Sequence, residues 1–238
     1  MTALLLLPGT LCDARVWAPV QGALTAAGCS LLSADLKAHR SAPAMASALL
    51  ETMPDRCAIA GFSLGGIVAL EMAAQAPQRV LGLALIATNA RPDPAESALA
   101  RRAAVIRARR TGIDAHVRGE LLPRYFGSAH AQDRALHDVV LGMAIDSGID
   151  AYSDQAEIAA CRADSRPRLH AIRVPTLVIG GAEDSINPAD RQQEMAHALP
   201  FAEWHQVAGA GHFVPLEAPA CVAGLMRRWL QRLEPGRH

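Results

Sequence analysis

The chain has 238 residues and balanced charge, with 23 basic and 23 acidic side chains. This length suits one α/β domain with a sizeable core, and zero net charge excludes a strong field toward nucleic acid or an anionic membrane. The five cysteines are scattered, with no Cys-x-x-Cys pair, so they predict thiols in a reducing compartment rather than a disulfide framework or a zinc site.

The N-terminal segment predicts a buried strand rather than a secretion signal. Ala3 to Leu7 form an apolar run that ends at Pro8 and Gly9, and no basic residue precedes it. No run of about 18 apolar residues occurs, so no transmembrane helix is expected. We therefore expect a soluble, cytoplasmic protein that does not associate with membranes.

The first third of the chain alternates strand and helix. Apolar runs predict strands at residues 3–7, 30–36, 57–62 and 80–87, and helical spacing predicts helices at 14–27, 43–53 and 64–76. Such β-α-β alternation favours a doubly wound parallel sheet with right-handed crossovers.

The alternation stops after the fourth strand. Residues 89–173 contain no predicted strand, only helical stretches at about 94–110, 113–125, 129–146 and 150–163. Arginines and acids occur there in near-equal numbers, which indicates a solvated outer surface. We expect this helical insertion (residues 89–173) to lie over the sheet as a lid, between core parts at 1–88 and 174–238.

The strand and helix pattern resumes after the insertion. Strands are predicted at 174–180 and 202–207, and helices at 188–199 and 215–233. The predicted fold is therefore α/β: a doubly wound, mostly parallel six-stranded sheet flanked by helices, with a helical lid inserted after the fourth core strand.

A candidate nucleophile, Ser63, lies between the third predicted strand and its helix. The segment reads Gly61-Phe62-Ser63-Leu64-Gly65. A serine on such a turn presents its hydroxyl clear of the backbone, and glycines on either side avoid collisions of a Cβ with the neighbouring turn. We expect strained backbone angles at the serine itself.

A serine nucleophile needs a base, and the base needs an acid to orient it. In an open α/β sheet such groups gather at the carboxyl ends of the strands. Of nine histidines, His212 directly follows a predicted strand through a glycine-rich turn. Glu183 and Asp184 follow the 174–180 strand, and Asp184 is the better acid because glycines precede it and a helix start follows it. Asp190, or an acid after the fourth strand, is the alternative.

Two backbone amides are predicted to stabilise the oxyanion that forms during acyl transfer. Leu64 begins the helix after the serine, and Thr10 follows Gly9 in the turn after the first strand. Leu11 is the alternative donor in that turn.

The substrate pocket is expected to include side chains adjacent to these positions. Leu11, Phe62 and Phe213 are the apolar candidates. Arg162 of the insertion is a candidate for binding a substrate carboxylate, with Arg166 as the alternative.

Together these segments resemble the α/β-hydrolase superfamily over essentially the whole chain. Residues 61–66 resemble its nucleophile elbow, 174–180 with Asp184 resemble its acid strand, and 211–219 resemble its histidine loop. Pro8-Gly9-Thr10 stands where many members have His-Gly-x. The chain departs from the family pattern in this proline and in lacking the N-terminal antiparallel strands.

The resemblance implies a serine hydrolase that uses Ser63, His212 and Asp184, without cofactor or metal, on a small-molecule ester or lactone. Small lid-bearing members such as carboxylesterases and 3-oxoadipate enol-lactonases are the most similar. A C–C bond hydrolase, an acyltransferase and a perhydrolase are alternatives on the same triad, and a ligand receptor with a residual triad is the non-enzymatic alternative. Haloalkane dehalogenases and epoxide hydrolases are disfavoured because they use aspartate at the position of Ser63. Physiological substrate and oligomeric state stay open.

Overall fold

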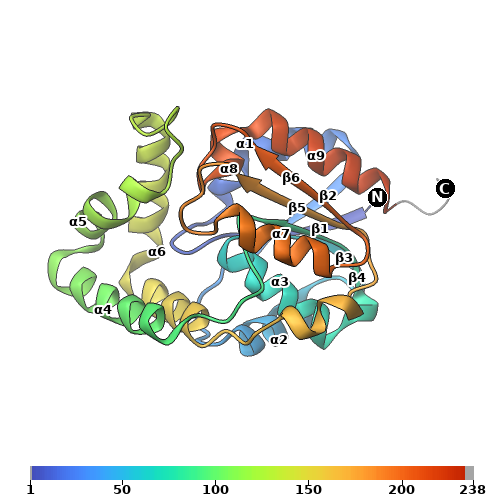
Figure 1. The fold of residues 1–238 in the computed structure, drawn as a ribbon, viewed down its shortest axis with the longest axis horizontal. Coiled ribbons are helices and arrows are strands. Elements are labelled where there is room, and N and C mark those ends of the chain that lie inside the picture. Colours follow the sequence, from blue (N-terminus) through green and yellow to red (C-terminus); the bar gives the residue numbers. More distant parts are fainter. Residues whose placement is uncertain (1, 234–238) are drawn as a thin grey trace.

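A computed structural model describes residues 2–233, which fold around a twisted six-stranded sheet (Figure 1). The strands are β1 (Thr2–Leu7), β2 (Cys29–Ser33), β3 (Cys57–Phe62), β4 (Val80–Ile86), β5 (Thr176–Gly181) and β6 (Ala202–Val207). Their order is β2-β1-β3-β4-β5-β6, and each neighbouring pair is parallel. The predicted α/β fold is confirmed, with a sheet that is parallel throughout.

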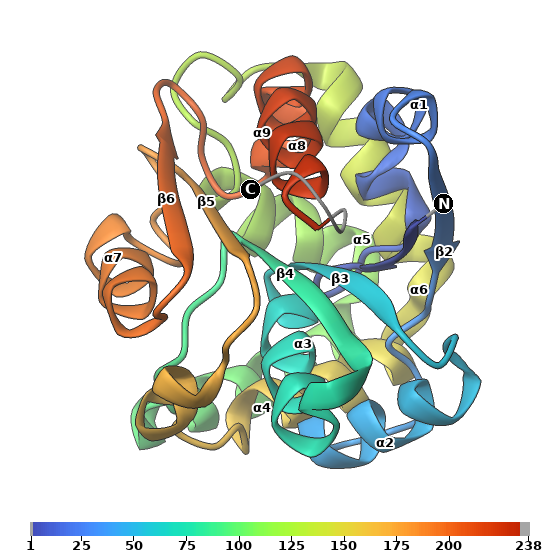
Figure 2. The same ribbon diagram turned by 90° about the vertical axis from the view of Figure 1, so that its right-hand side faces the viewer.

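Helices cover both faces of this sheet. The core helices are α1 (Ala18–Ala26), α2 (Ala42–Thr52), α3 (Leu64–Gln75), α7 (Ala189–Ala198), α8 (Val214–Glu217) and α9 (Pro219–Gln231), with 3-10 turns η1 (Ala14–Val16) and η2 (Pro77–Arg79). Figure 2 shows α1 and α9 on one face, with α2 and α3 on the other.

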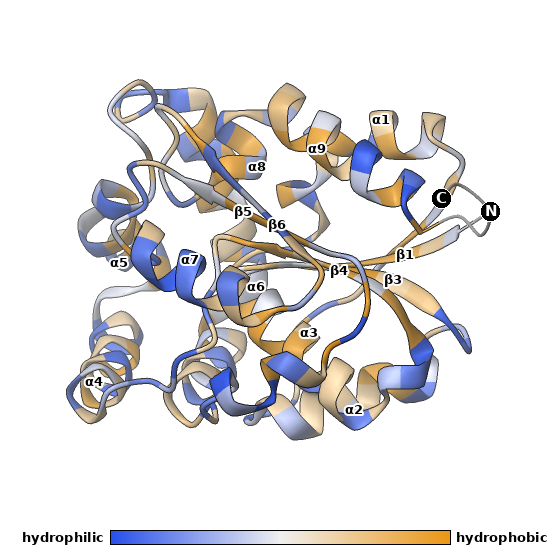
Figure 3. Ribbon diagram, turned by 45° about the vertical axis from the view of Figure 1, so that its right-hand side comes forward, coloured by the Kyte–Doolittle hydropathy of each residue, from blue (hydrophilic) through white to orange (hydrophobic). Residues whose placement is uncertain are grey.

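The central strands are apolar on both faces, which is why both need covering. In β1, Leu4 and Leu6 belong to the apolar layer under α1 and α9, whereas Leu5 and Leu7 belong to the layer under α2 and α3. This is the two-residue alternation of a strand buried on both sides. Figure 3 shows hydrophobic residues along these central strands and on α3.

Three element boundaries differ from the prediction. Strand β2 ends at Ser33, and Leu36 is buried in the following loop instead of the strand. The first helix begins as a separate 3-10 turn, whose N-cap is Asp13. The last helix is two helices, α8 and α9, because Pro219 lacks the N–H that would continue the first one.

The helical insertion contains helical elements only, and the structure describes all its residues. These are α4 (Ala95–Thr111), α5 (Ile113–His116), a π-helical turn η3 (Val117–Leu121), and 3-10 turns η4 (Leu122–Arg124) and η5 (Arg166–Ala171) around the long α6 (Arg134–Ala160). The predicted helix start at 129 is wrong, because Asp133 caps α6 with its side chain. The predicted break between the helices at 129–146 and 150–163 is confirmed, because Gly148, with a φ of 77° and a ψ of 172°, is non-helical and divides α6 into two helical segments.

The insertion lies at the carboxyl ends of the strands, to the left of the sheet in Figure 1. Strand order reverses between β1 and β3, so the loops that follow these strands lead to opposite sides of the sheet. In open α/β sheets this switch point is where a ligand crevice forms.

None of the helices within residues 2–233 combines the length and apolarity that crossing a bilayer requires.

Candidate active site

Ser63 occupies the sharp turn between β3 and α3. Its φ of 50° and ψ of −110° lie in a region that is unfavourable for a residue with a side chain. A Cβ on Gly61 would lie 2.4 Å from the carbonyl oxygen of Gly65, and a Cβ on Gly65 would lie 2.4 Å from that of Leu7. Close backbone packing therefore requires both glycines, and it holds the serine in its strained conformation.

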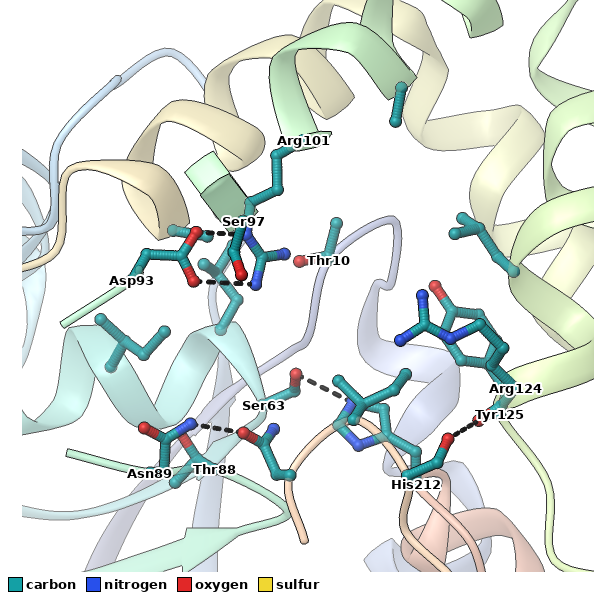
Figure 4. Close-up of a pocket in the computed structure, with 18 of the residues that line it drawn as sticks. Thr10, Ser63, Thr88, Asn89, Asp93, Ser97, Arg101, Arg124, Tyr125 and His212 are labelled. Atoms are coloured by element: carbon teal, nitrogen blue, oxygen red, sulfur yellow. Dashed lines mark hydrogen bonds and ion pairs between the residues drawn. The ribbon is translucent and has the colours of Figure 1, made fainter. Parts of the chain in front are cut away.

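Ser63, His212 and Asp184 form one chain of hydrogen bonds. The His212 Nε2 lies 3.0 Å from the Ser63 Oγ (Figure 4), and the His212 Nδ1 lies 2.9 Å from the Asp184 Oδ2. The other oxygen of Asp184 accepts the N–H groups of Ile186 and Asn187, each at 2.9 Å. A carboxylate facing Nδ1 selects the tautomer that carries its proton there, which leaves Nε2 to accept the serine hydroxyl proton.

The other acids considered from the sequence face different partners. Glu183 accepts hydrogen bonds from the backbone N–H and the hydroxyl of Ser128 in the insertion, at 2.6 and 3.1 Å. Asp190 lies 3.7 Å from the guanidinium of Arg91. The carboxylate that contacts His212 is that of Asp184, whose side chain is fully buried.

Thr10 and Leu64 lie beside Ser63 with unengaged backbone amides. Both residues line the cavity over the serine, and neither N–H donates to another group within residues 2–233. The Leu11 N–H, in contrast, already donates to the Gln155 Oε1 at 2.8 Å. Of the two alternatives in this turn, the Thr10 amide is thus the one available to an oxyanion.

The histidine loop is tied to the insertion by contacts that sequence reasoning missed. The His212 N–H donates to the Tyr125 carbonyl at 2.7 Å. The buried Glu217 carboxylate accepts the N–H groups of Gly211, at 2.9 and 3.0 Å, and of Gly127, at 2.7 Å. Burial raises the pKa of Glu217. Glu217 lies only five residues after His212, so its closeness to the histidine loop could be read from the sequence. Its contact with Gly127 could not, because Gly127 is far away in the sequence.

A cavity of about 450 Å³ opens over the triad between the sheet and the insertion. Phe62 and Phe213 line it, as do Tyr125 and the buried Thr88, whose hydroxyl has no hydrogen-bond partner in the part of the chain that is described. Leu11 was expected in this pocket but lies outside its lining, in the apolar core, since its positive φ turns the chain there.

Neither arginine proposed from the sequence has a free guanidinium. Arg162 reaches the cavity wall, but it is buried, pairs with Asp93 at 2.9 Å and donates to the Arg91 carbonyl. Burial lowers the pKa of Arg162. Arg166 lies away from the cavity and pairs with Asp164 at 2.7 Å.

In residues 2–233, no three His, Cys, Asp or Glu side chains are grouped as metal ligands would be.

Comparison with known proteins gives consistent matches. A family model described as alpha/beta hydrolase fold matches residues 2–219. A relative in Variovorax paradoxus (strain S110), provisionally named the carbamate hydrolase RutD, is 31% identical over 228 residues, covering 88% of this chain and 84% of its own. A pimeloyl-[acyl-carrier protein] methyl ester esterase of Neisseria meningitidis is 32% identical over 214 residues, covering 83% and 81%.

A solved structure adds to these matches. A thermophilic esterase of Thermogutta terrifontis, with malate bound, superposes with a TM-score of 0.88 at 26% identity, covering 98% of this chain and 90% of its own.

Proposed function

The chain belongs to the α/β-hydrolase fold family and is an enzyme that acts on ester-like bonds; we propose that it cleaves a small carboxylic ester or lactone through an acyl-serine intermediate. The observation that carries this proposal is the hydrogen-bonded chain from Ser63 through His212 to Asp184, which opens on a cavity large enough for a small molecule.

In the acylation step, the Ser63 Oγ attacks the substrate carbonyl while His212 Nε2 takes the hydroxyl proton. Asp184 keeps the ring oriented and stabilises the imidazolium that forms. The carbonyl oxygen gains negative charge, and the amides of Thr10 and Leu64 are the proposed donors to it. When the tetrahedral intermediate collapses, the leaving oxygen takes the proton from His212 and Ser63 keeps the acyl group.

Deacylation repeats these roles with water. His212 removes a proton from a water molecule, the hydroxide attacks the acyl carbon, and the Ser63 oxygen leaves with the proton that His212 returns. We propose that the helical insertion acts as the lid of this site, because Tyr125 and neighbouring residues of the insertion line the cavity over the serine. A lid of this kind excludes bulk water and selects the substrate.

The test is Ser63→Ala, assayed on a panel of short acyl esters, lactones and vinylogous diketones. We expect kcat on the best ester or lactone to fall by about four to six orders of magnitude while circular dichroism and the melting temperature are unchanged. The wild-type protein should label with a fluorophosphonate, and Ser63→Ala should not. A receptor with an inert triad would stay unlabelled, and preference for the diketones would instead indicate a C–C bond hydrolase.

A further inference from the structure

The cavity over Ser63 has cationic walls, although the chain as a whole is neutral. Among its lining residues are five arginines and two acids within the described part of the chain: Arg101, Arg107, Arg124, Arg162, Arg191, Asp93 and Glu120. The whole chain carries 23 basic and 23 acidic side chains. A concave site lined by one sign of charge raises the local concentration of ligands of the opposite sign.

Three of the five arginines already form ion pairs, although Arg101 and Arg162 share one carboxylate. The Asp93 carboxylate, almost fully buried, lies 2.8 Å from Arg101 and 2.9 Å from Arg162. Arg107 pairs with Glu120 at 2.6 Å. Arg124 and Arg191 form no ion pair within residues 2–233, so their charges are available to a ligand in the cavity.

Arg124 is the better placed of these two, because the loops that carry Asp184 and His212 hydrogen-bond to the backbone around it. Its carbonyl accepts the hydroxyl of Ser185, the neighbour of Asp184, at 3.3 Å. The next residue, Tyr125, accepts the His212 N–H. Figure 4 shows the Arg124 side chain at the cavity beside Tyr125 and His212, with Arg101 and Asp93 on the opposite wall.

We propose that Arg124 binds a carboxylate of the substrate at a position away from the bond that is cleaved. The inference rests on the proposed function and narrows it to esters or lactones that carry a free carboxylate. A guanidinium matches a carboxylate with two parallel N–H···O bonds, and no acid in the described structure competes for this one. Since Arg124 is exposed, solvent screens the pair and its contribution is moderate.

The experiment compares kcat/KM for monomethyl and dimethyl esters of dicarboxylic acids from malonate to suberate. The monoesters carry the free carboxylate and the diesters do not. For the best chain length we expect the wild-type enzyme to prefer the monoester by about 10- to 100-fold. Arg124→Gln should abolish this preference by slowing the monoester, with the diester changed by less than about twofold, and Arg124→Lys should restore part of it.

Two matched variants test whether the effect belongs to Arg124. Arg110→Gln removes an exposed arginine of α4 that does not line the cavity, and Arg191→Gln removes the other unpaired lining arginine. Both should keep the preference for the monoester. Loss of the preference in Arg191→Gln with Arg124→Gln unaffected would overturn the assignment.

Equal turnover of monoester and diester by the wild-type enzyme would overturn the anionic substrate class while leaving the acyl-serine function intact. If neither ester is hydrolysed and Ser63 does not label, the proposed function itself fails. Binding of the free dicarboxylates to Ser63→Ala still tests the arginine, because calorimetry should detect weaker binding when Arg124→Gln is added. Unchanged affinity there would contradict the proposal.

Discussion

The sheet core and the helical insertion contribute in different ways to the same site. The core provides all three members of the candidate triad, Ser63 after β3, Asp184 after β5 and His212 after β6. The insertion provides none of them. It instead hydrogen-bonds the loops that carry Asp184 and His212 and the turn after β1, and it supplies the arginine that we propose for substrate binding.

Each of three core loops has such a bond from the insertion. Gln155 holds the turn after β1 by accepting the Leu11 N–H, Ser128 donates to Glu183 beside the acid, and the Tyr125 carbonyl accepts the His212 N–H. The comparison teaches that sheet topology places the reactive groups at one edge, whereas the insertion restrains how those loops sit relative to one another. Substitutions in the two regions should therefore have different effects on stability and on activity.

The largest effect on the free energy of unfolding is expected from the core substitution Gly65→Ala. The new Cβ would lie 2.4 Å from the Leu7 carbonyl oxygen, and neither backbone can move without breaking the packing of β1 against α3. We expect a loss of about 3 kcal/mol or more in the free energy of unfolding, together with loss of activity. Urea denaturation measures it. Gly224→Ala in α9, where the Cβ would meet only an Arg228 side chain at 3.7 Å, is the control, and equal losses in both variants would contradict this reading.

The next effect is expected in the insertion, from Gln155→Met. Gln155 is fully buried, accepts the Leu11 N–H and donates to the Leu36 carbonyl at 3.0 Å. Methionine fills the space but leaves both backbone groups unsatisfied, which costs about 2–4 kcal/mol. Because the turn that holds Thr10 loosens, kcat should fall more than KM rises.

Steady-state kinetics and denaturation of Gln155→Met should be compared with Gln132→Met, an exposed glutamine of the same insertion. That control should change stability by less than about 0.5 kcal/mol. A Gln155→Met enzyme with wild-type kcat would show that the insertion does not restrain the oxyanion turn.

The difference between the sheet core and the insertion explains how much of the fold and of the site could be predicted from the sequence. Parallel strands are signalled locally by apolar runs such as those of β1 and β3, and reactive groups in such a sheet follow strand ends. That reasoning selected Ser63, Asp184 and His212, which the structure brings within hydrogen-bond distance of one another. Each of these signals lies within a few residues of the group that it identifies.

The insertion was less predictable because its signals are not local. An arginine has the same side chain whether it is paired or free, and its state depends on the acids that the fold brings near it. Arg162 was therefore proposed for a substrate carboxylate although Asp93 holds it, whereas Arg124, which has no such partner in the described residues, was not singled out. The start of α6 was misplaced for a related reason, since the side chain of Asp133 overrides the apolar spacing before it.

A smaller effect, dependent on pH, is expected where the two regions meet at Glu217. Glutamine in its place keeps the size, and its oxygen can replace the Oε2 that accepts both the Gly127 and the Gly211 N–H. Its NH2 group then faces the Gly211 N–H, which lies 3.0 Å from the Oε1 in the wild-type protein, and two donors facing each other cost about 1–2 kcal/mol. Burial raises the pKa of Glu217, so the folded state holds this proton more tightly than the unfolded chain does. Such a group stabilises the fold at low pH, and this contribution is lost as the pH rises through its raised pKa.

The stability difference between the wild-type protein and Glu217→Gln should therefore shrink from acid to neutral pH. Denaturant titrations at a series of pH values measure it, with Glu51→Gln on the exposed side of α2 as the control for loss of one carboxylate. A difference that grows with pH would mean that the hydrogen bonds to the charged form outweigh the cost of burying it.

The smallest effects, of opposite sign, are expected from two glycines, one in each region. Gly22 lies within α1 of the core, and a Cβ there would have no atom within 4 Å. Alanine should raise the free energy of unfolding by about 0.5–1 kcal/mol, since it restricts the unfolded chain and suits a helix. Gly148 also has open space, but its φ of 77° and ψ of 172° at the kink of α6 suit glycine almost alone. Alanine there should cost about 1 kcal/mol and, by straightening α6, alter KM more than kcat. If both variants were stabilised, the kink would not be a required feature of the insertion.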